Sequence, residues 1–245
     1  MSAQVPADHA RRIGLADSTP SKYLKALEAQ AGGGLVVHEI YASIQGESTY
    51  AGRPCSFVRL TACHLRCRYC DTPHAFGQGQ WMSRESVISS LRELGIPLIE
   101  LTGGEPLLQA ESIPLMSELC DAGYEVMLET SGSLDIRPVD TRVKRIVDLK
   151  TPSSGELAAN RWDNLDALTD HDEVKFVLGN REDYEWAREV VRRHSVNERC
   201  PVLFSCVFGS LSPKTLVSWL VEDRLPVRFQ LQLHKVVWDP AARGV

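Results

Sequence analysis

Apolar runs rich in β-branched residues alternate with helical patterns along most of this chain of 245 residues. Helices are expected at residues 83–94, 113–122, 182–194 and 213–222. Strands are expected at residues 35–44, 55–60, 97–101, 124–130, 145–149, 173–178, 202–205 and 227–233. This alternation is typical of parallel strands joined by helical crossovers. Because the helical patterns number fewer than eight, we expect an α/β fold, a partial (incomplete) TIM-like barrel of parallel strands.

The first 34 residues differ from the rest of the chain. They are polar and end in Ala31-Gly32-Gly33-Gly34, a composition that indicates a flexible break. One short helical pattern covers residues 22–30. We therefore expect a flexible N-terminal extension over residues 1–34 and one large domain over residues 35–245.

Composition excludes several classes of protein. The net charge of −5 argues against a nucleic-acid partner. No run of 18 apolar residues exists that could span a membrane, and the first 20 residues lack the apolar core of a secretory signal. Seven cysteines, an odd number, favour free thiols in a reducing cytoplasm over a disulfide framework.

Polar and glycine-rich segments follow several of the expected strands. They are Thr102-Gly103-Gly104-Glu105, Glu129-Thr130-Ser131-Gly132, Asp148-Leu149-Lys150 and Ser205. The carboxyl ends of parallel strands carry the functional site in α/β folds. These separate loops are therefore expected to converge on one pocket.

Three thiols, Cys63, Cys67 and Cys70, fall within eight residues, one ligand short of a closed tetrahedral metal site. They could be three structural cysteines, although His64 and two arginines stand among them. A zinc site would take His64 or His74 as its fourth ligand, but zinc usually recruits pairs from separated segments. An iron–sulfur cluster is the remaining option for soft ligands, and three thiolates would leave one iron open.

This spacing resembles that of the radical S-adenosylmethionine superfamily, with aromatic Tyr69 before the last cysteine and the loop Thr102–Pro106 after a later strand. The resemblance implies that residues 35–245 form a catalytic domain with a 4Fe–4S cluster on the three cysteines. The open iron would bind S-adenosylmethionine, whose reductive cleavage gives a radical that abstracts a substrate hydrogen. Two glycines alone would also suit a tight turn; in the functional interpretation they let the backbone approach a ligand, and Glu105 orients the loop.

Further motifs lie at residues 39–47 (EIYASIQGE), 52–54, 57–60, 70–72, 129–132, 173–176 and 232–235. Together they resemble the 7-carboxy-7-deazaguanine synthase family over residues 36–235. The resemblance implies a lyase of queuosine biosynthesis. Such an enzyme converts 6-carboxy-5,6,7,8-tetrahydropterin to 7-carboxy-7-deazaguanine, releases ammonia, regenerates S-adenosylmethionine and uses Mg²⁺.

The resemblance also implies residue roles. Substrate contacts are expected from Ile44, Gln45, Gly46, Arg59 and Thr102, with Arg59 on the substrate carboxylate. Thr72 is expected to bind Mg²⁺. Contacts to S-adenosylmethionine are expected from Tyr69, Cys70, Asp71, Gly104, Asp148, Leu149, Lys150 and Ser205. No further catalytic side chain is expected.

Two other functions remain open at this point. One is an activase for a glycyl-radical enzyme, which would need an open face for a protein partner. The other is a non-catalytic iron–sulfur or zinc module, which would need a fourth ligand and no glycine-rich loop. For the synthase, we expect a homodimer, a pterin substrate and an electron donor such as flavodoxin or ferredoxin. The chain departs from the family pattern at two places. It has Ser48-Thr49 where relatives often have glycine. Ten residues follow Lys235, whereas in some relatives the chain ends close to the substrate.

Overall fold

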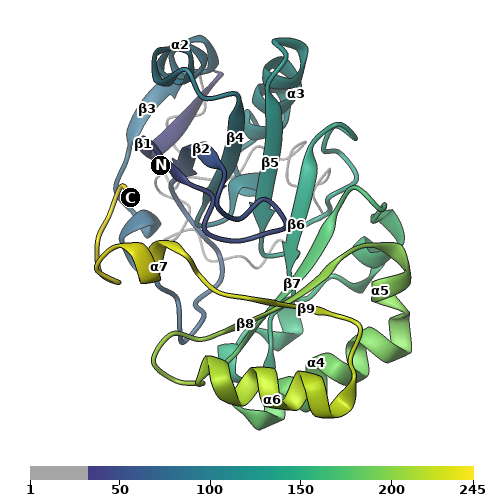
Figure 1. The fold of residues 1–245 in the computed structure, drawn as a ribbon. Coiled ribbons are helices and arrows are strands. Elements are labelled where there is room, and N and C mark those ends of the chain that lie inside the picture. The colour runs from purple at the N-terminus through teal and green to yellow at the C-terminus, as the bar shows by residue number, and fades with distance from the viewer. Residues whose placement is uncertain (1–32) are drawn as a thin grey trace.

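The computed structural model describes residues 33–245, which form one open, twisted sheet with helices on its outer side (Figure 1). The strands are β1 Gly34–Ile44, β2 Pro54–Leu60, β3 Gln80–Ser83, β4 Leu98–Gly103, β5 Glu125–Thr130, β6 Lys144–Asp148, β7 Glu173–Leu178, β8 Val202–Cys206 and β9 Arg228–Gln230. Their order across the sheet is β3-β1-β2-β4-β5-β6-β7-β8-β9.

The strands from β2 and β4 through β9 are parallel, and β1 is antiparallel to both β2 and β3. The ladder does not close between the edge strands β3 and β9. The predicted α/β partial barrel is therefore confirmed. Strand β3 was not predicted, because it has only four residues and its side chains are exposed or half-buried.

The helices of residues 33–245 are α2 Arg84–Leu94, α3 Ser112–Asp121, α4 Arg181–His194, α5 Val196–Arg199, α6 Pro213–Asp223 and α7 His234–Val237. The four predicted helices correspond to α2, α3, α4 and α6. At the start of α2, the hydroxyl of Ser83 accepts a hydrogen bond from the backbone N–H of Ser86, as expected of an N-cap. None of the helices in this described part of the chain is long and apolar enough to cross a membrane.

The C-terminal end of the fold differs from the prediction. The expected strand over residues 227–233 is only three residues long as β9, and α7 follows it. The backbone leaves the sheet because the N–H of Leu233 donates to the carbonyl of Gly46, 2.9 Å away. Tertiary hydrogen bonding thus overrides the local strand pattern.

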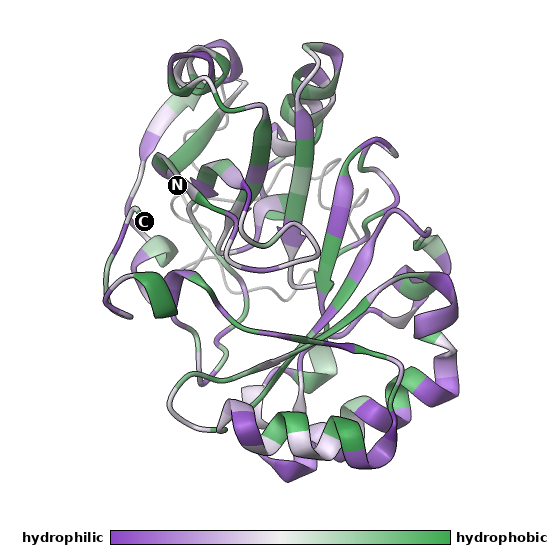
Figure 2. Ribbon diagram, viewed as in Figure 1, coloured by the Kyte–Doolittle hydropathy of each residue, from purple (hydrophilic) through white to green (hydrophobic). Residues whose placement is uncertain are grey.

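The core lies between the sheet and its outer helices. Figure 2 shows apolar residues along the strands and on the sheet-facing sides of the helices. Tyr184, Phe176 and Phe204 are its largest fully buried side chains. Side chains alternate across a strand, so in β7 Val174 and Phe176 join this core while Lys175 points to the opposite, concave face.

The predicted extension over residues 1–34 and its helical pattern at residues 22–30 lie outside the described residues, apart from Gly33 and Gly34. Gly34 already belongs to β1, where it pairs with Ser83 of β3. The proposed boundary between extension and domain remains a prediction.

Candidate active site

A cavity of about 680 Å³ lies on the concave side of the sheet, at the carboxyl ends of the parallel strands. Most of the predicted site residues line it: Ile44, Gln45, Gly46, Arg59, Cys63, Cys67, Tyr69, Cys70, Asp71, Thr72, Thr102, Gly104, Asp148 and Lys150. Leu149 and Ser205 do not, because Leu149 is buried in the apolar core and Ser205 is buried within β8. A direct cofactor contact from these two remains a prediction without support from the cavity.

The three thiols stand on the loop of residues 61–72, which we call the cluster loop. It joins β2 to the 3₁₀ helix Pro73–Phe76 (η3). Burial raises the pKa of all three thiols, that of Cys63 to about 12. Metal binding at these sulfurs must therefore release protons. Three half-buried or buried thiols on one cavity wall are a donor set that fits a cluster with one open iron.

The glycine loop packs against the cluster loop. A side chain at Gly104 would collide with the Ala62 carbonyl oxygen and lie 2.8 Å from Cβ of Cys63. Gly103 has a φ of +137°, a conformation that other residues rarely adopt. The N–H groups of Gly104 and Glu105 donate to the carbonyls of Leu60 and Ala62. The glycines thus place backbone against backbone, which fixes the loop beside the thiols.

Glu105 is completely buried and holds the glycine loop in place. Its carboxylate accepts hydrogen bonds from Thr130 Oγ1, from Ser131 N at 2.8 Å and from Leu107 N at 3.1 Å. The predicted orienting role of this side chain is therefore confirmed. The hydroxyl of Ser131 also forms a hydrogen bond with the hydroxyl of Ser133, which lies 2.9 Å from Nε2 of His64. The hydrogen-bond network of Glu105 therefore reaches the cluster loop.

Asp148 and Lys150 form an ion pair of 2.9 Å at the end of β6, and both line the cavity. The other carboxylate oxygen of Asp148 is buried with no hydrogen-bond partner among residues 33–245. Buried polar atoms are rarely left unpaired in folded proteins. This orphaned acceptor, beside a lysine ammonium, suits a ligand that has both hydroxyl and carboxylate groups, as S-adenosylmethionine has.

A charged network on the concave face was missed from the sequence. Nζ of Lys175 lies 2.5 Å from a carboxylate oxygen of Glu47 and also contacts Glu129. The burial of Glu129 raises its pKa to about 7, whereas Lys175 holds the pKa of Glu47 below its usual range against the effect of burial. The sequence carried one signal of this network: Glu129 and Lys175 are charged residues that stand next to apolar ones in strands that are otherwise mostly buried.

A second carboxyl group, Glu100 of β4, supports Gln45. The Gln45 amide donates to Glu100, and its oxygen accepts from the N–H of Glu47 at 2.9 Å. Burial, reinforced by the charge of Glu129, raises the pKa of Glu100 to about 8. Both hydrogen bonds fix the orientation of the Gln45 amide at the cavity wall.

Arg59 lies in the same cavity, at the end of β2. Its Nε donates to Glu39 at 2.6 Å and its Nη2 to the hydroxyl of Tyr41 at 2.7 Å. Nη1 has no hydrogen-bond partner in the part of the chain that the structure describes. The guanidinium is thus held in one orientation with a donor still available, and its contact with substrate remains a prediction.

Thr72 precedes η3 without capping it, since its hydroxyl donates instead to Asp71 at 3.0 Å. The pKa of the Asp71 carboxyl is held far below its usual range. Burial raises this pKa, but the ammonium group of Lys235, 2.6 Å away, lowers it more. Thr72 and Asp71 both line the cavity. Binding of Mg²⁺ by Thr72 remains a prediction.

Residues 230–235, which we call the strap, close the open side of the partial barrel (Figure 1). Gln230 donates to the Ser48 carbonyl at 2.9 Å, and Gln232 to Glu47 at 2.7 Å. Ser48 has a φ of +63°, a backbone conformation that favours glycine. The strap and residues 240–245 add His234, Lys235 and Arg243 to the cavity lining.

An open α/β partial barrel with three thiols and a glycine loop at its strand ends is the architecture of a radical S-adenosylmethionine enzyme. Residues 58–197 match the Radical SAM superfamily. The fold also resembles the crystal structure of QueE from Escherichia coli, with a TM-score of 0.68 over 84% of this chain and 97% of that one, at 20% identity.

Sequence comparison identifies the family within this superfamily. A protein from Koribacter versatilis, named 7-carboxy-7-deazaguanine synthase, is 46% identical over 85% of this chain and 99% of its own length. One of the same name from Chlorobaculum tepidum is 46% identical over 86% of this chain and 97% of its own. The chain belongs to the 7-carboxy-7-deazaguanine synthase family, lyases that carry a 4Fe–4S cluster and use S-adenosylmethionine.

Proposed function

We propose that this enzyme converts 6-carboxy-5,6,7,8-tetrahydropterin to 7-carboxy-7-deazaguanine with loss of ammonia, in the biosynthesis of queuosine-type nucleosides. The observation that carries the proposal is the meeting, in one cavity, of three thiols, a guanidinium with an available donor and a ring of buried carboxyl and amide groups. A small, flat, anionic and hydrogen-bonding substrate suits these walls.

The cofactors would occupy the side of the cavity that the cluster loop forms. Cys63, Cys67 and Cys70 would hold the cluster, and S-adenosylmethionine bound to it supplies the radical that takes a hydrogen from the substrate. Asp148 and Lys150 would bind polar groups of S-adenosylmethionine, beside Gly104 and Tyr69. The Tyr69 hydroxyl, 3.3 Å from the Val177 carbonyl, holds this aromatic ring against the cavity.

The substrate would lie against the opposite wall. Arg59 would pair with its carboxylate, because a guanidinium matches a carboxylate geometrically. The pterin edge would meet hydrogen-bond acceptors on Gln45, Glu47 and Glu129 and a donor on the Gln45 amide. Lys175 contacts both glutamates and so holds the two carboxyl groups together despite their like charge. Ile44, Gly46 and Thr102 would complete the substrate contacts that we predict.

Mg²⁺ would bind beside Thr72. A neutral hydroxyl is a weak ligand, and Mg²⁺ demands several oxygen ligands. The substrate carboxylate and water would have to supply the rest, so metal and substrate would assist each other's binding. Asp71, whose carboxylate accepts from Thr72, supplies negative charge nearby.

Incubation of the anaerobically reconstituted enzyme with S-adenosylmethionine, a low-potential reductant and carboxytetrahydropterin tests the proposal. Mass spectrometry should find 7-carboxy-7-deazaguanine and ammonia. Tetrahydropterin, which lacks the carboxylate, is the matched control and should not be converted. Cleavage of S-adenosylmethionine with no ring-contracted product would leave a radical enzyme of another specificity and refute the proposed substrate.

The activase alternative predicts a different surface. An activase must admit a protein segment to its radical, whereas the strap and residues 240–245 cover part of this cavity. The buried charges of its wall also suit a small polar molecule. These features favour the synthase over an activase, and the glycine loop disfavours a non-catalytic module.

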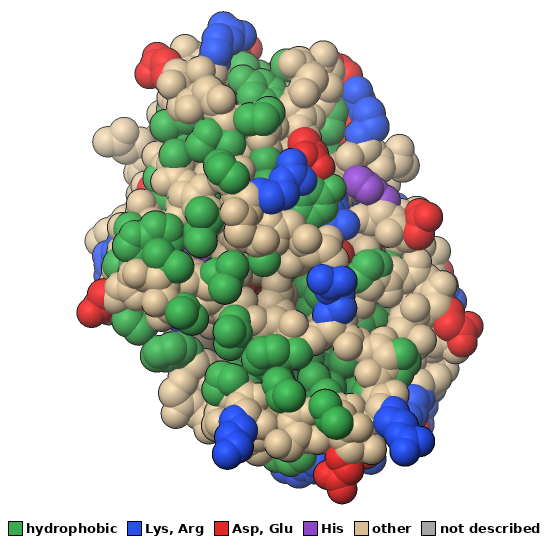
Figure 3. Space-filling model, viewed as in Figure 1, with side chains coloured by type: hydrophobic (Ala, Val, Ile, Leu, Met, Phe, Trp, Pro, Cys, Tyr) green, Lys and Arg blue, Asp and Glu red, His purple; other side chains and the backbone are tan. Residues whose placement is uncertain are grey.

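We also propose that the enzyme is a homodimer that works in the cytoplasm and receives electrons from a flavodoxin or a ferredoxin. Apolar side chains gather on one face over α6, β9 and α7 (Figure 3). They include Val221, Val236 and Val237, which are 71%, 67% and 59% exposed. Exposed apolar patches often mark interfaces between proteins. Sedimentation of wild type and Val221→Glu would test whether this face joins two copies.

A further inference from the structure

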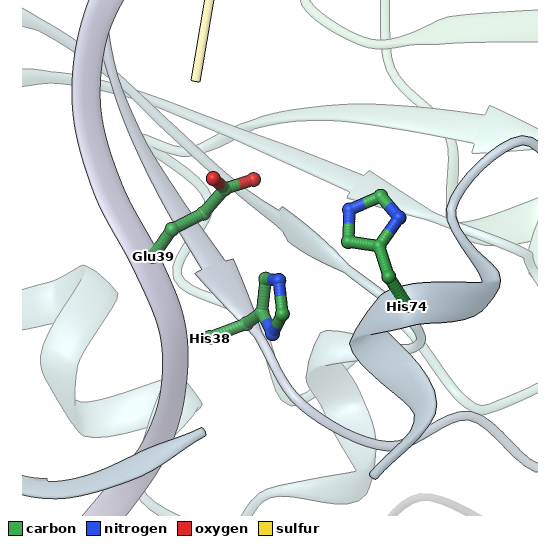
Figure 4. A group of neighbouring side chains, drawn as sticks. All are labelled: His38, Glu39 and His74. Carbon is green, nitrogen blue, oxygen red and sulfur yellow. The ribbon is translucent and has the colours of Figure 1, made fainter. Parts of the chain in front are cut away.

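Two histidines and a glutamate outside the thiol set come together beside the cavity, which the glutamate and one of the histidines line. They are His38 and Glu39 of β1 and His74 of η3. The ligand atoms that they offer all lie within 4.8 Å of one another. Figure 4 shows the three side chains turned toward one shared space, with His38 and Glu39 on the strand and His74 on the short helix.

A β-bulge brings the two strand residues together. Val37 pairs with Leu60 and Glu39 with Arg59, so His38 has no partner on β2. In a regular strand, neighbouring side chains point to opposite faces. A bulge re-aims the side chains around it. It accounts for the approach of His38 and Glu39 to the same space, which the sequence alone would not predict.

The hydrogen bonds of these side chains leave ligand atoms available. Nδ1 of His38 lies 2.9 Å from the Gln78 carbonyl, an acceptor that favours the tautomer with hydrogen on Nδ1. The other ring nitrogen then keeps its lone pair, as in metal-bound histidines whose second nitrogen donates to a carbonyl. Glu39 accepts from Arg59 through one carboxylate oxygen, at 2.6 Å, so the other oxygen can bind an ion.

We infer that His38, Glu39 and His74 bind a divalent transition-metal ion of the zinc type. Two imidazoles and one carboxylate are a donor set that zinc takes with a fourth position left for water or another ligand. Imidazole nitrogens select such ions over Mg²⁺, which prefers oxygen. The site shares no ligand with the three cysteines or with Thr72. Binding would place each ligand atom about 2.0–2.2 Å from the ion.

Bound metal would join β1 to η3, the helix that directly follows Thr72. It would therefore tie the end of the cluster loop to strand β1, which lies between β3 and β2 in the sheet. It would also add positive charge close to Arg59, through the shared Glu39 carboxylate. The inference does not depend on the proposed substrate, because it concerns protein ligands alone.

Equilibrium dialysis of the reconstituted holoenzyme against Zn²⁺ tests this inference, with zinc and iron measured by mass spectrometry. The cluster keeps the thiols occupied, and its absorbance is followed throughout. We expect one zinc per chain beyond the iron, which excess Mg²⁺ does not displace. His38→Gln and His74→Gln should each weaken zinc binding by about tenfold or more.

His194→Gln is the matched control, since His194 is also a half-buried histidine but stacks on Trp162, 5.3 Å between ring centres. It should bind zinc as wild type does. Zinc should also raise the melting temperature of wild type and of His194→Gln, but not of His74→Gln. Equal zinc binding by wild type and His74→Gln, or no zinc bound by wild type, would overturn the inference. His74→Gln alone decides the question if His38→Gln does not fold.

Discussion

Arg59 is held by two neighbours before any substrate arrives, which makes its predicted role testable. Arg59→Lys keeps the charge but loses the planar fork, so it should weaken substrate binding more than S-adenosylmethionine binding. The expected loss is about 1.5–3 kcal/mol, typical of a hydrogen bond to a charged group. Calorimetric titration measures both affinities. Tyr41→Phe, which removes only a partner of Arg59, is the control, and unchanged substrate affinity in Arg59→Lys would refute the assignment.

Thr72 should link metal to substrate. Thr72→Val keeps the shape and removes the oxygen, so it should reduce the mutual strengthening of Mg²⁺ and substrate binding while the cluster remains intact. By linkage, each ligand raises the affinity of the other by the same factor. Substrate affinity is measured with and without Mg²⁺ in both proteins. Equal strengthening in wild type and Thr72→Val would mean that the hydroxyl is not a ligand.

Glu100 should make stability depend on pH. Its pKa is raised from 4.5 to about 8, first by burial and then by Glu129, so the folded state holds its proton more tightly than the unfolded state. Its stabilising contribution is therefore complete below about pH 4.5 and is lost as pH rises toward 8. Glu100→Gln keeps the shape and cannot titrate.

The free energy of unfolding should thus fall less steeply with pH in Glu100→Gln than in wild type. The difference in slope should approach about 1.4 kcal/mol per pH unit between pH 5 and 8 at most. Urea denaturation at several pH values under anaerobic conditions measures it. Parallel curves for the two proteins would show that Glu100 does not carry this dependence.

At the level of elements, the strap depends on a glycine opposite it. A side chain at Gly46 would collide with Nδ1 of His234 and lie 3.3 Å from the His234 backbone nitrogen. Gly46→Ala should therefore displace α7 and break the bond from Leu233 to Gly46. We expect a destabilisation of about 1–3 kcal/mol, as for other overpacked sites, and loss of turnover.

Gly77→Ala is the control, because nothing lies within 4 Å of a side chain there. Adding His234→Ala to Gly46→Ala should restore part of the melting temperature, since the main collision is with that ring. If the double variant is no more stable than the sum of the single variants predicts, the strap is not coupled to Gly46 in this way.

The elements that the sequence predicted well are those whose burial agrees with their local pattern. Strand β7 was predicted at its observed bounds, and Ser83 at the start of α2, because both signals are local. Strand β9 and helix α7 were not, since residues 230–233 donate hydrogen bonds to residues 46–48, which draws the chain out of the sheet. The bulge at His38 also leaves no local mark in the sequence.

At the scale of the whole molecule, some features of the site were predicted from local sequence patterns and others are revealed only by the fold. The cysteine spacing and the glycine loop are short-range patterns, and their convergence at the strand ends was predicted. The pairing of Glu47 with Lys175 joins residues 128 positions apart, so only the fold reveals it. Contact of residues 240–245 with the cavity likewise follows from the path of the strap.

The central claim is that three thiols hold a cluster with one iron open to S-adenosylmethionine. Iron and sulfide analysis of anaerobically prepared protein, with electron paramagnetic resonance of the reduced form, tests it most directly. We predict about four irons and four sulfides per chain, and a changed spectrum when S-adenosylmethionine is added. Zinc on the cysteines with no sulfide, or a cluster spectrum that S-adenosylmethionine leaves unchanged, would contradict the account.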